Sequence, residues 1–266
     1  MSQIDSPARL PTFTLGATRW PDAAAYLAVG CISVLLWWLC RSQVSALPAF
    51  APWDFSFVEF AGSWLAAWWY WRGLTMTPRA ERPGMGRQVA FFAGLVTIYV
   101  VLETHFEYLA EHQFFYNRLM HAALHHLGPF LLAISWPGAT LARGVPAPFM
   151  RLSRSNWLNA GLRVLQQPVI AGFVFVALIF FWLVPPIHFR AMIDPRLFRI
   201  MNWSMVLDGV LFWFIVLDPR PCPPAKISAV GRLCMAGLVI VPQVMGGALI
   251  TLARSDIYPY YDLCGR

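Results

Sequence analysis

Two histidines that lie four residues apart, His121 and His125, are the residues of this sequence best suited to chemistry. They belong to a stretch, residues 103–137, that contains five of the chain's 6 histidines within an otherwise apolar sequence. From its middle onward the stretch has the pattern of a helix, in which residues four apart lie one turn apart on the same face. Two imidazoles at this spacing can chelate a metal ion, although the same spacing also suits two histidines satisfied by local hydrogen bonds.

The composition places this helix in a lipid bilayer. Hydrophobic residues make up 58% of the chain and charged residues 12%, and the mean hydropathy is +0.56, values that soluble domains do not reach. Ionisable groups at membrane depth are costly and mark candidate functional sites. The net charge of +7 comes from basic residues scattered through the loops, so it carries topological information and indicates no nucleic-acid partner.

The predicted fold class is an all-α integral membrane protein with seven transmembrane helices. We expect a cytosolic tail over residues 1–22, a membrane domain over residues 23–253 and a periplasmic tail over residues 254–266. The loop over residues 138–167 places basic residues among Leu, Phe and Trp, which predicts an amphipathic segment along the cytosolic lipid surface. The expected helices span residues 23–40, 56–73, 88–106, 117–136, 168–185, 202–217 and 230–253.

The distribution of basic residues predicts the orientation of these helices. The N-terminus and the loops on its side of the membrane hold 13 of the 20 Lys and Arg residues, and the opposite side holds 7. Positive residues prefer the cytoplasm, so the N-terminus is expected inside and the C-terminus outside. We therefore expect a multi-pass protein of a bacterial inner membrane.

This orientation brings several polar side chains to the outer half of the membrane. At about 1.5 Å per residue, His121 would lie about 6 Å and His125 about 12 Å below the outer boundary. The other members expected at comparable depth are Glu59, Glu103, His105 and Asp208. Each of these groups could instead be satisfied locally, by an arginine or a backbone carbonyl, but few cations are expected in the outer half to balance the carboxylates.

Imidazoles with supporting carboxylate and thioether groups suit copper or zinc better than magnesium or calcium. Gln243, which follows Pro242, is expected to line the same cavity, and His112 is expected to capture a metal before it reaches the deeper pair. His126 points away from His125 and is expected to pack or to support a ligand. The soft donors available for Cu(I), which are equally suited to core packing, are Met120, Met201, Met205, Met245 and the thiol of Cys264.

Three blocks of sequence resemble the CtaG family of multi-helix membrane proteins, which are cytochrome c oxidase assembly factors. The blocks are AEHQFFYNRLMHAALHH at residues 110–126, NWSMVLDGVLFWFIVLDPRP at residues 202–221 and PQVMGGALITLARSDIYPYY at residues 242–261. The resemblance implies a seven-helix fold and a role in oxidase maturation through copper supply. The positions that match the family's motifs are His112, His121, His125, Asp208, Asp218 and Gln243.

The chain departs from the family pattern at two positions. Many members have Met directly after the first histidine of the motif, where this chain has Ala122, and a His near the start of the sixth helix, where this chain has Asn202. Both departures affect the ligand set that the resemblance implies.

The resulting hypothesis is a non-enzymatic inner-membrane assembly factor that binds copper, as Cu(I), from the periplasmic side. His121 and His125 would be the main ligands, with His105 and His112 as auxiliary ligands. The expected partners are oxidase subunits, the lipid bilayer and a periplasmic copper chaperone. The cavity or supporting residues would be Glu59, Glu103, Asp208, Gln243 and Met120.

Two other functions fit parts of the pattern. A copper permease or resistance protein would need polar groups that continue to the inner face, and few lie below Gln243. A b-type cytochrome would ligate haem through histidines on different helices. Two haems would need histidines in both leaflets, so collection of the histidines in one leaflet disfavours haem and allows one at most.

Overall fold

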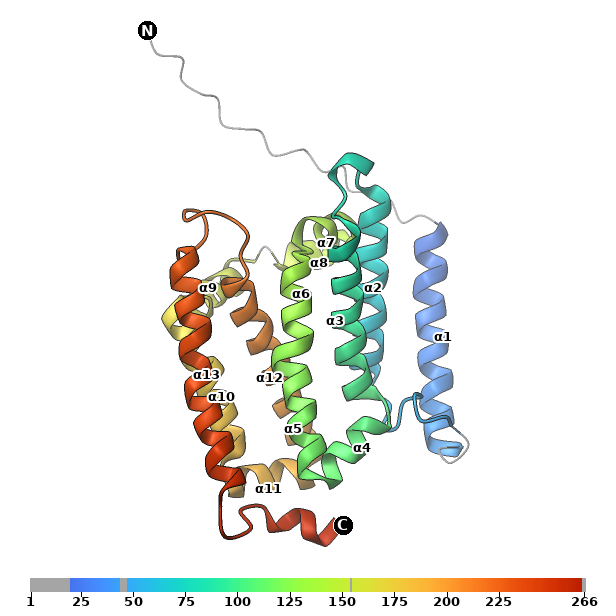
Figure 1. Cartoon of the computed structure of the whole chain (residues 1–266). Coiled ribbons are helices and arrows are strands. Elements are labelled where there is room, and N and C mark those ends of the chain that lie inside the picture. The colour runs from blue at the N-terminus through green and yellow to red at the C-terminus, as the bar shows by residue number, and fades with distance from the viewer. Residues whose placement is uncertain (1–19, 44–46, 154, 265–266) are drawn as a thin grey trace.

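The computed structural model describes residues 20–43, 47–153 and 155–264, so most of the expected N-terminal tail lies outside the described part. All regular structure within these residues is helical, which confirms the all-α class. Figure 1 shows the long helices side by side, running along one common direction between two ends of the molecule. They are α1 (Trp20–Ser42), α2 (Phe57–Met76), α3 (Met85–Glu103), α10 (Pro168–Leu183), α12 (Pro195–Val216) and α13 (Ala229–Thr251).

One further long segment carries the histidine pair and is built from three consecutive pieces. These are α5 (Phe114–Ala122), a π-helical turn η3 (Ala123–Leu127) and α6 (Gly128–Ser135). Each of the seven expected segments therefore falls on helix, with boundaries shifted by at most seven residues.

Length and apolar composition identify a smaller number of membrane spans. In the described residues four helices, α1, α3, α12 and α13, are long and apolar enough to cross a bilayer. A fifth candidate is α10 together with α9 (Asn156–Leu165), which meet at a bend of 76°. These helices make the chain a membrane protein. The seven-span topology and its orientation stay predictions.

Short helices close the two ends of the bundle (Figure 1). The lower end in this view holds α4 (His105–His112), α11 (Pro185–Ile193) and the C-terminal segment (residues 252–264), which includes the 3-10 helix η4 (Pro259–Cys264). The upper end holds α7 (Gly138–Gly144), α8 (Ala147–Ser153) and α9, three short helices that cover the residues of the predicted amphipathic segment. A 3-10 turn, η2 (Arg79–Glu81), lies between α2 and α3.

Helix α12, which corresponds to the sixth expected segment, begins seven residues earlier than the sequence predicts. Pro195 occupies its first turn, and the Asp194 side chain caps it by accepting hydrogen bonds from the N–H groups of Arg196 and Leu197. The arginines of this first turn hide the apolar pattern from which the helix start was predicted. Asp208 consequently lies about 20 Å along the helix at about 1.5 Å per residue, further from the helix start than the sequence predicts.

Thr104 separates α3 from α4. Its hydroxyl accepts a hydrogen bond from the N–H of Phe106 at 3.3 Å and donates one to the carbonyl of Val100 at 2.6 Å. Side chains of this kind compete with the helical ladder and favour a new N-terminus. His105 therefore begins the short end helix, and the prediction that it extends the third long helix is wrong.

At the upper end a close contact joins α2 to α7. A Cβ atom on Gly144 would overlap the backbone of Trp69, so only glycine permits this approach. Arg72 uses it by donating to the Gly144 carbonyl at 2.7 Å, and its Nε lies 2.9 Å from the buried Asp22 carboxylate of α1. One arginine thus ties three elements together.

Candidate functional site

The π-helical turn has a cause in the sequence. In a regular α-helix the carbonyl of His125 would accept a hydrogen bond from residue 129, but Pro129 has no N–H. The Gly128 N–H instead bonds to the carbonyl of Ala123, five residues back. The freed carbonyl of His125 accepts a hydrogen bond from the Trp213 indole of α12 at 3.3 Å. Turns of this type are frequent at functional sites, and this one interrupts the regular α-helical spacing expected between His121 and His125.

Gly209 lets α12 approach this turn closely. A Cβ atom at that position would lie 2.5 Å from the carbonyl oxygen of His125 and 2.9 Å from the ring of Pro129. Asp208, which precedes Gly209 on α12, can then reach the ring of His125. Pro129, Gly209 and Trp213 together fix where the His125 ring lies.

His125 and Asp208 form a buried pair. The Nε2 atom of His125 lies 3.0 Å from the Asp208 carboxylate, and the ring stacks on Phe175 with centroids 3.9 Å apart. An ionised carboxylate only accepts hydrogen bonds, so it fixes the proton on Nε2 and leaves the lone pair on Nδ1. That Nδ1 atom is buried without a hydrogen-bond partner. A histidine oriented by a carboxylate in this way has the form of a metal ligand with its supporting group.

His121 is the second unusual histidine. Its side chain is 6% exposed, and neither of its ring nitrogens has a hydrogen-bond partner. Most buried polar atoms are hydrogen-bonded, so an imidazole with two unpaired nitrogens calls for an explanation. The ring lies within electrostatic range of Arg118, His188 and His125. The amide of Asn202, 1% exposed on α12, is likewise unpaired at both its oxygen and its nitrogen.

The histidine pair does not form a complete nitrogen and oxygen site. Among the residues that the structure describes, no three His, Cys, Asp or Glu side chains are grouped closely enough to hold a metal ion. The predicted sulfur donors Met120, Met201 and Met205 are fully buried in one apolar cluster at the same end of the bundle. Thioethers are soft ligands that suit Cu(I), and this donor set fits Cu(I) better than a harder ion.

The predicted carboxylates Glu59 and Glu103 belong to a separate group at the lower ends of α2 and α3. Glu59 interacts with the Trp203 indole and with Arg199. Glu103 is fully buried, and neither carboxylate oxygen reaches hydrogen-bonding geometry, although the backbone amides of Ser56 and Phe60 lie close. Within the described contacts, these two carboxylates interact with each other and with their own surroundings rather than with His121 or His125.

Glu107 of α4 joins this carboxylate group and was missed by the sequence analysis. Its side chain is 6% exposed, and burial together with the nearby Glu59 and Glu111 raises its pKa well above the usual range. The uncharged form of Glu107 is therefore favoured, which makes it poorly suited to balance a metal charge. A signal was available, because α4 is amphipathic and Glu107 falls on its inner face three residues before the buried Ala110.

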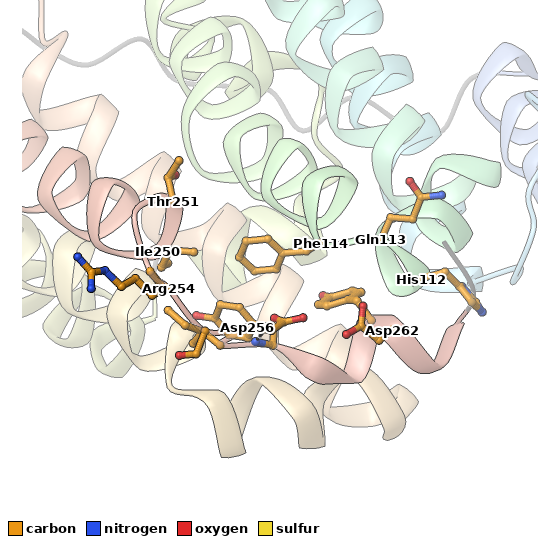
Figure 2. A pocket seen from close by; sticks show the side chains of 13 residues that line it. His112, Gln113, Phe114, Ile250, Thr251, Arg254, Asp256 and Asp262 are labelled. Atoms are coloured by element: carbon orange, nitrogen blue, oxygen red, sulfur yellow. Dashed lines mark hydrogen bonds between the residues drawn. The ribbon is translucent and has the colours of Figure 1, made fainter.

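The two auxiliary histidines lie at opposite ends of α4, away from the deeper pair. His105 packs against Trp53 in a tilted arrangement with centroids 4.6 Å apart, and its Nδ1 is buried without a hydrogen-bond partner. His112 donates from Nδ1 to the carbonyl of Tyr108 at 2.7 Å and lines a pocket of about 740 Å³. Figure 2 shows this pocket between His112 and Gln113 on one side and the end of α13 on the other, with the Phe114 ring between them.

Gln243 contacts a different histidine from the one expected. Its amide donates to the Val239 carbonyl of its own helix at 2.9 Å and interacts with His126. His126 packs on Phe175 and Trp213, in agreement with its predicted packing role. Met245 is 60% exposed on the outer side of α13, so its predicted place in the site is wrong. The side chain of Cys264 lies outside the described residues.

The sequence analysis also missed His188, which is 1% exposed on α11. Its Nδ1 bonds to the Trp182 carbonyl at 3.1 Å, and its Nε2 lies 2.7 Å from the hydroxyl of Tyr261. Burial, with a further contribution from Arg118, lowers the pKa of His188 to about 4, so the ring is neutral at pH 7. Its spacing of four residues from Met192 on one helix was the signal available in the sequence.

Fold and site together define a helical membrane protein with a buried, carboxylate-oriented histidine on an interrupted helix. The family model described as cytochrome c oxidase caa3 assembly factor (Caa3_CtaG) matches residues 68–265, and the chain belongs to that family. No curated protein and no solved structure matches the chain. The matched region begins within α2 after Glu59 and contains all the histidines, Asp208 and Gln243. This is a family of cytochrome c oxidase assembly factors.

Proposed function

We propose that this protein assists the assembly of a cytochrome c oxidase in a bacterial inner membrane by binding copper, as Cu(I), at His121 and His125. The observation that carries the proposal is the state of these two rings. Three of their four ring nitrogens are buried without a hydrogen-bond partner, and the fourth is bound to Asp208. Buried nitrogens without a hydrogen-bond partner cost stability unless a bound metal ion uses their lone pairs.

The donor atoms favour Cu(I) over harder ions. Two neutral imidazoles would supply borderline ligands, and the buried methionines Met120, Met201 and Met205 would supply soft ones. One charge on Asp208 balances one charge on Cu(I), which suits a site of low dielectric constant. The chain would act by binding and releasing copper as cargo, without an enzymatic step.

Copper would reach and leave this site at the lower end in Figure 1, which is the predicted periplasmic end. His112 lines the open pocket at that end, and His105 has an unpaired Nδ1 on the same short helix. These two histidines would receive copper from a periplasmic chaperone. An oxidase subunit that docks at this end would then take copper from the protein.

The test compares His121→Ala/His125→Ala with the matched control His126→Ala, which removes a neighbouring histidine that contacts Phe175, Trp213 and Gln243. Copper content of the detergent-purified protein and oxidase activity of the cells are measured. We expect the double variant to lose the copper bound at this site and to lower oxidase activity at unchanged protein level, while the control keeps both.

Unchanged oxidase activity in the double variant would overturn the proposal. A haem absorption band in the purified protein would favour the cytochrome alternative, and copper flux into proteoliposomes would favour a permease.

A further inference from the structure

The protonation of His188 is fixed by its neighbours. The backbone carbonyl of Trp182 can only accept a hydrogen bond, so Nδ1 of His188 carries the proton. Nε2 then has a free lone pair, which accepts a hydrogen bond from the Tyr261 hydroxyl at 2.7 Å. A backbone carbonyl on Nδ1 and an unprotonated Nε2 are what metal-binding histidines commonly show. His188 thus has the form of a ligand whose free nitrogen is covered by a tyrosine.

A soft donor converges on the same hydroxyl. Met192 follows His188 by one turn of α11, and its Sδ lies 3.3 Å from the oxygen of Tyr261. The amide of Asn117 approaches the same sulfur at 3.6 Å and so holds it in place. Metal–nitrogen and metal–sulfur bonds are about 2.0 and 2.3 Å in zinc sites. An ion at the position of the hydroxyl would be within about 1 Å of bonding distance to both donors.

We propose that Nε2 of His188 and Sδ of Met192 form a second Cu(I) site, which the hydroxyl of Tyr261 covers in this structure. The identity of the metal rests on the proposed function, whereas the convergence of the two donors does not. One imidazole and one thioether suit the low coordination number and soft character of Cu(I). His188 lies within electrostatic range of His121, so this site would be the outer stage of the same copper path.

The C-terminal segment is placed so that it can uncover the site. Tyr258 holds it by donating a hydrogen bond to the Leu183 carbonyl at 2.7 Å and by stacking on Phe114 with centroids 4.5 Å apart. Space is available on both sides of the segment. The pocket of about 740 Å³ in Figure 2 lies on one side, and a second pocket of about 500 Å³ lies between the segment and α11. A partner that draws the segment aside would expose both donors at the predicted outer end.

The test uses the full chain in detergent with His121→Ala/His125→Ala as background, so that copper at the first site is removed. Cu(I) binding is measured without oxygen against a competing Cu(I) chelator. We expect this background to keep one Cu(I), and Met192→Leu added to it to weaken binding about tenfold or more. Leu keeps the volume of Met, so thermal unfolding in detergent should confirm that this variant remains folded.

Two tyrosine variants in the same background test the covering role. Tyr261→Phe removes the competing hydroxyl and keeps the ring, so we expect about tenfold tighter binding, the equivalent of one hydrogen bond. Tyr258→Phe removes a hydrogen bond from the same segment but leaves both donors covered, so we expect no change beyond about twofold. An equal gain in the two variants would overturn the covering role, because it would reflect only a looser segment.

The copper content of these variants distinguishes failure of the second Cu(I) site, here called the outer site, from failure of the proposed function. Copper in the unmodified protein that is wholly lost in the background would overturn the outer site and leave the first site intact. Copper that stays in the background after Met192→Leu would likewise overturn it. Absence of copper from the unmodified protein and from every variant would overturn both.

Discussion

At the scale of single residues, the chemistry of His125 depends on which ring nitrogen carries the proton. Asp208 fixes it on Nε2 and so keeps Nδ1 available as a ligand atom. His188 has the opposite tautomer, because its Nδ1 faces a carbonyl and its Nε2 faces a hydroxyl. The two histidines therefore present different nitrogens to a metal, and each is set by one neighbouring oxygen.

Asp208→Asn should weaken copper binding by about 10- to 100-fold, because the amide keeps the shape but loses the charge that orients the ring. Cu(I) competition on the purified protein measures this. Asp218→Asn is the matched control, since Asp218 pairs with Arg220 and not with a histidine. Equal affinities of the Asp208 variant and the unmodified protein would refute the orienting role.

Asp218 gives a prediction of pH dependence. The Nη2 of Arg220 lies 2.7 Å from its carboxylate, and hydrogen bonds from Arg220, with Arg232 nearby, lower its pKa below the usual 3.8. The ionised form is thus favoured in the folded state, and its contribution to stability is present above pH 3.8 and lost as the pH falls through the lower folded pKa. Because Arg220 is half exposed, Asp218→Asn should cost only about 0.5–1 kcal/mol at pH 7.

Thermal unfolding in detergent measures the difference between Asp218→Asn and the unmodified protein. This difference should shrink toward zero as the pH falls through the lowered folded pKa of Asp218. A difference that stays constant with pH would show that the ion pair is not its source.

At the scale of elements, the site depends on a hydrogen bond that is missing from the histidine-bearing helix and is replaced by one from α12. Pro129 removes one hydrogen-bond donor, the helix takes up a π turn, and α12 supplies the Trp213 indole as a replacement. Gly209 makes room for this exchange. The same contact brings Asp208 to His125, so the packing of α12 and the chemistry of the site are set together.

Gly209→Ala should disrupt this contact, because the added Cβ would lie 2.5 Å from the His125 carbonyl oxygen. We expect a loss of about 1–3 kcal/mol in stability and weaker copper binding. Gly237→Ala on α13 is the matched control, since a Cβ there meets nothing within 4 Å. Thermal unfolding and Cu(I) competition would measure both effects. Similar behaviour of the two variants would argue against the close approach.

At the scale of the whole molecule, the polar groups considered for copper are distributed unequally between the ends. His105, His112, His188 and Met192 lie on the short helices at the lower end in Figure 1, and the opposite end holds arginine contacts such as Arg72 with Asp22. The proposed path therefore opens at one end only. Its direction in the cell depends on the orientation predicted from the basic residues.

Thiol labelling of intact cells measures that orientation. Cys222, exposed in the loop between α12 and α13, should react with a membrane-impermeant reagent only after the cells are opened. Cys introduced at Ser255, past the end of α13, should react in intact cells, in a background with Cys264→Ser to remove a competing thiol. The reverse pattern would place the N-terminus outside and exclude periplasmic loading.

Part of the site could be foreseen from the sequence. His121 and His125 stand out because imidazoles are rare in an apolar helix, and Asp208 stands out for the same reason. Their depths were harder to predict, because Asp194 and Pro195 start α12 among arginines that conceal its apolar pattern. The sequence predicts Glu59 and Glu103 at a depth comparable to that of the histidines. They belong to another group of side chains, because helix packing decides which side chains face one another.

The sequence by itself determined a helical membrane protein and the residues able to bind a metal, because hydrophobic length and residue type are local properties. Pro129 also removed a helical hydrogen bond locally. Only the tertiary structure decided that Trp213 and Gly209 would accommodate that loss, that Asp208 would orient His125, and that Tyr261 would cover His188. These pairings join residues 73 to 88 positions apart, and they arise from helix packing that no local pattern encodes.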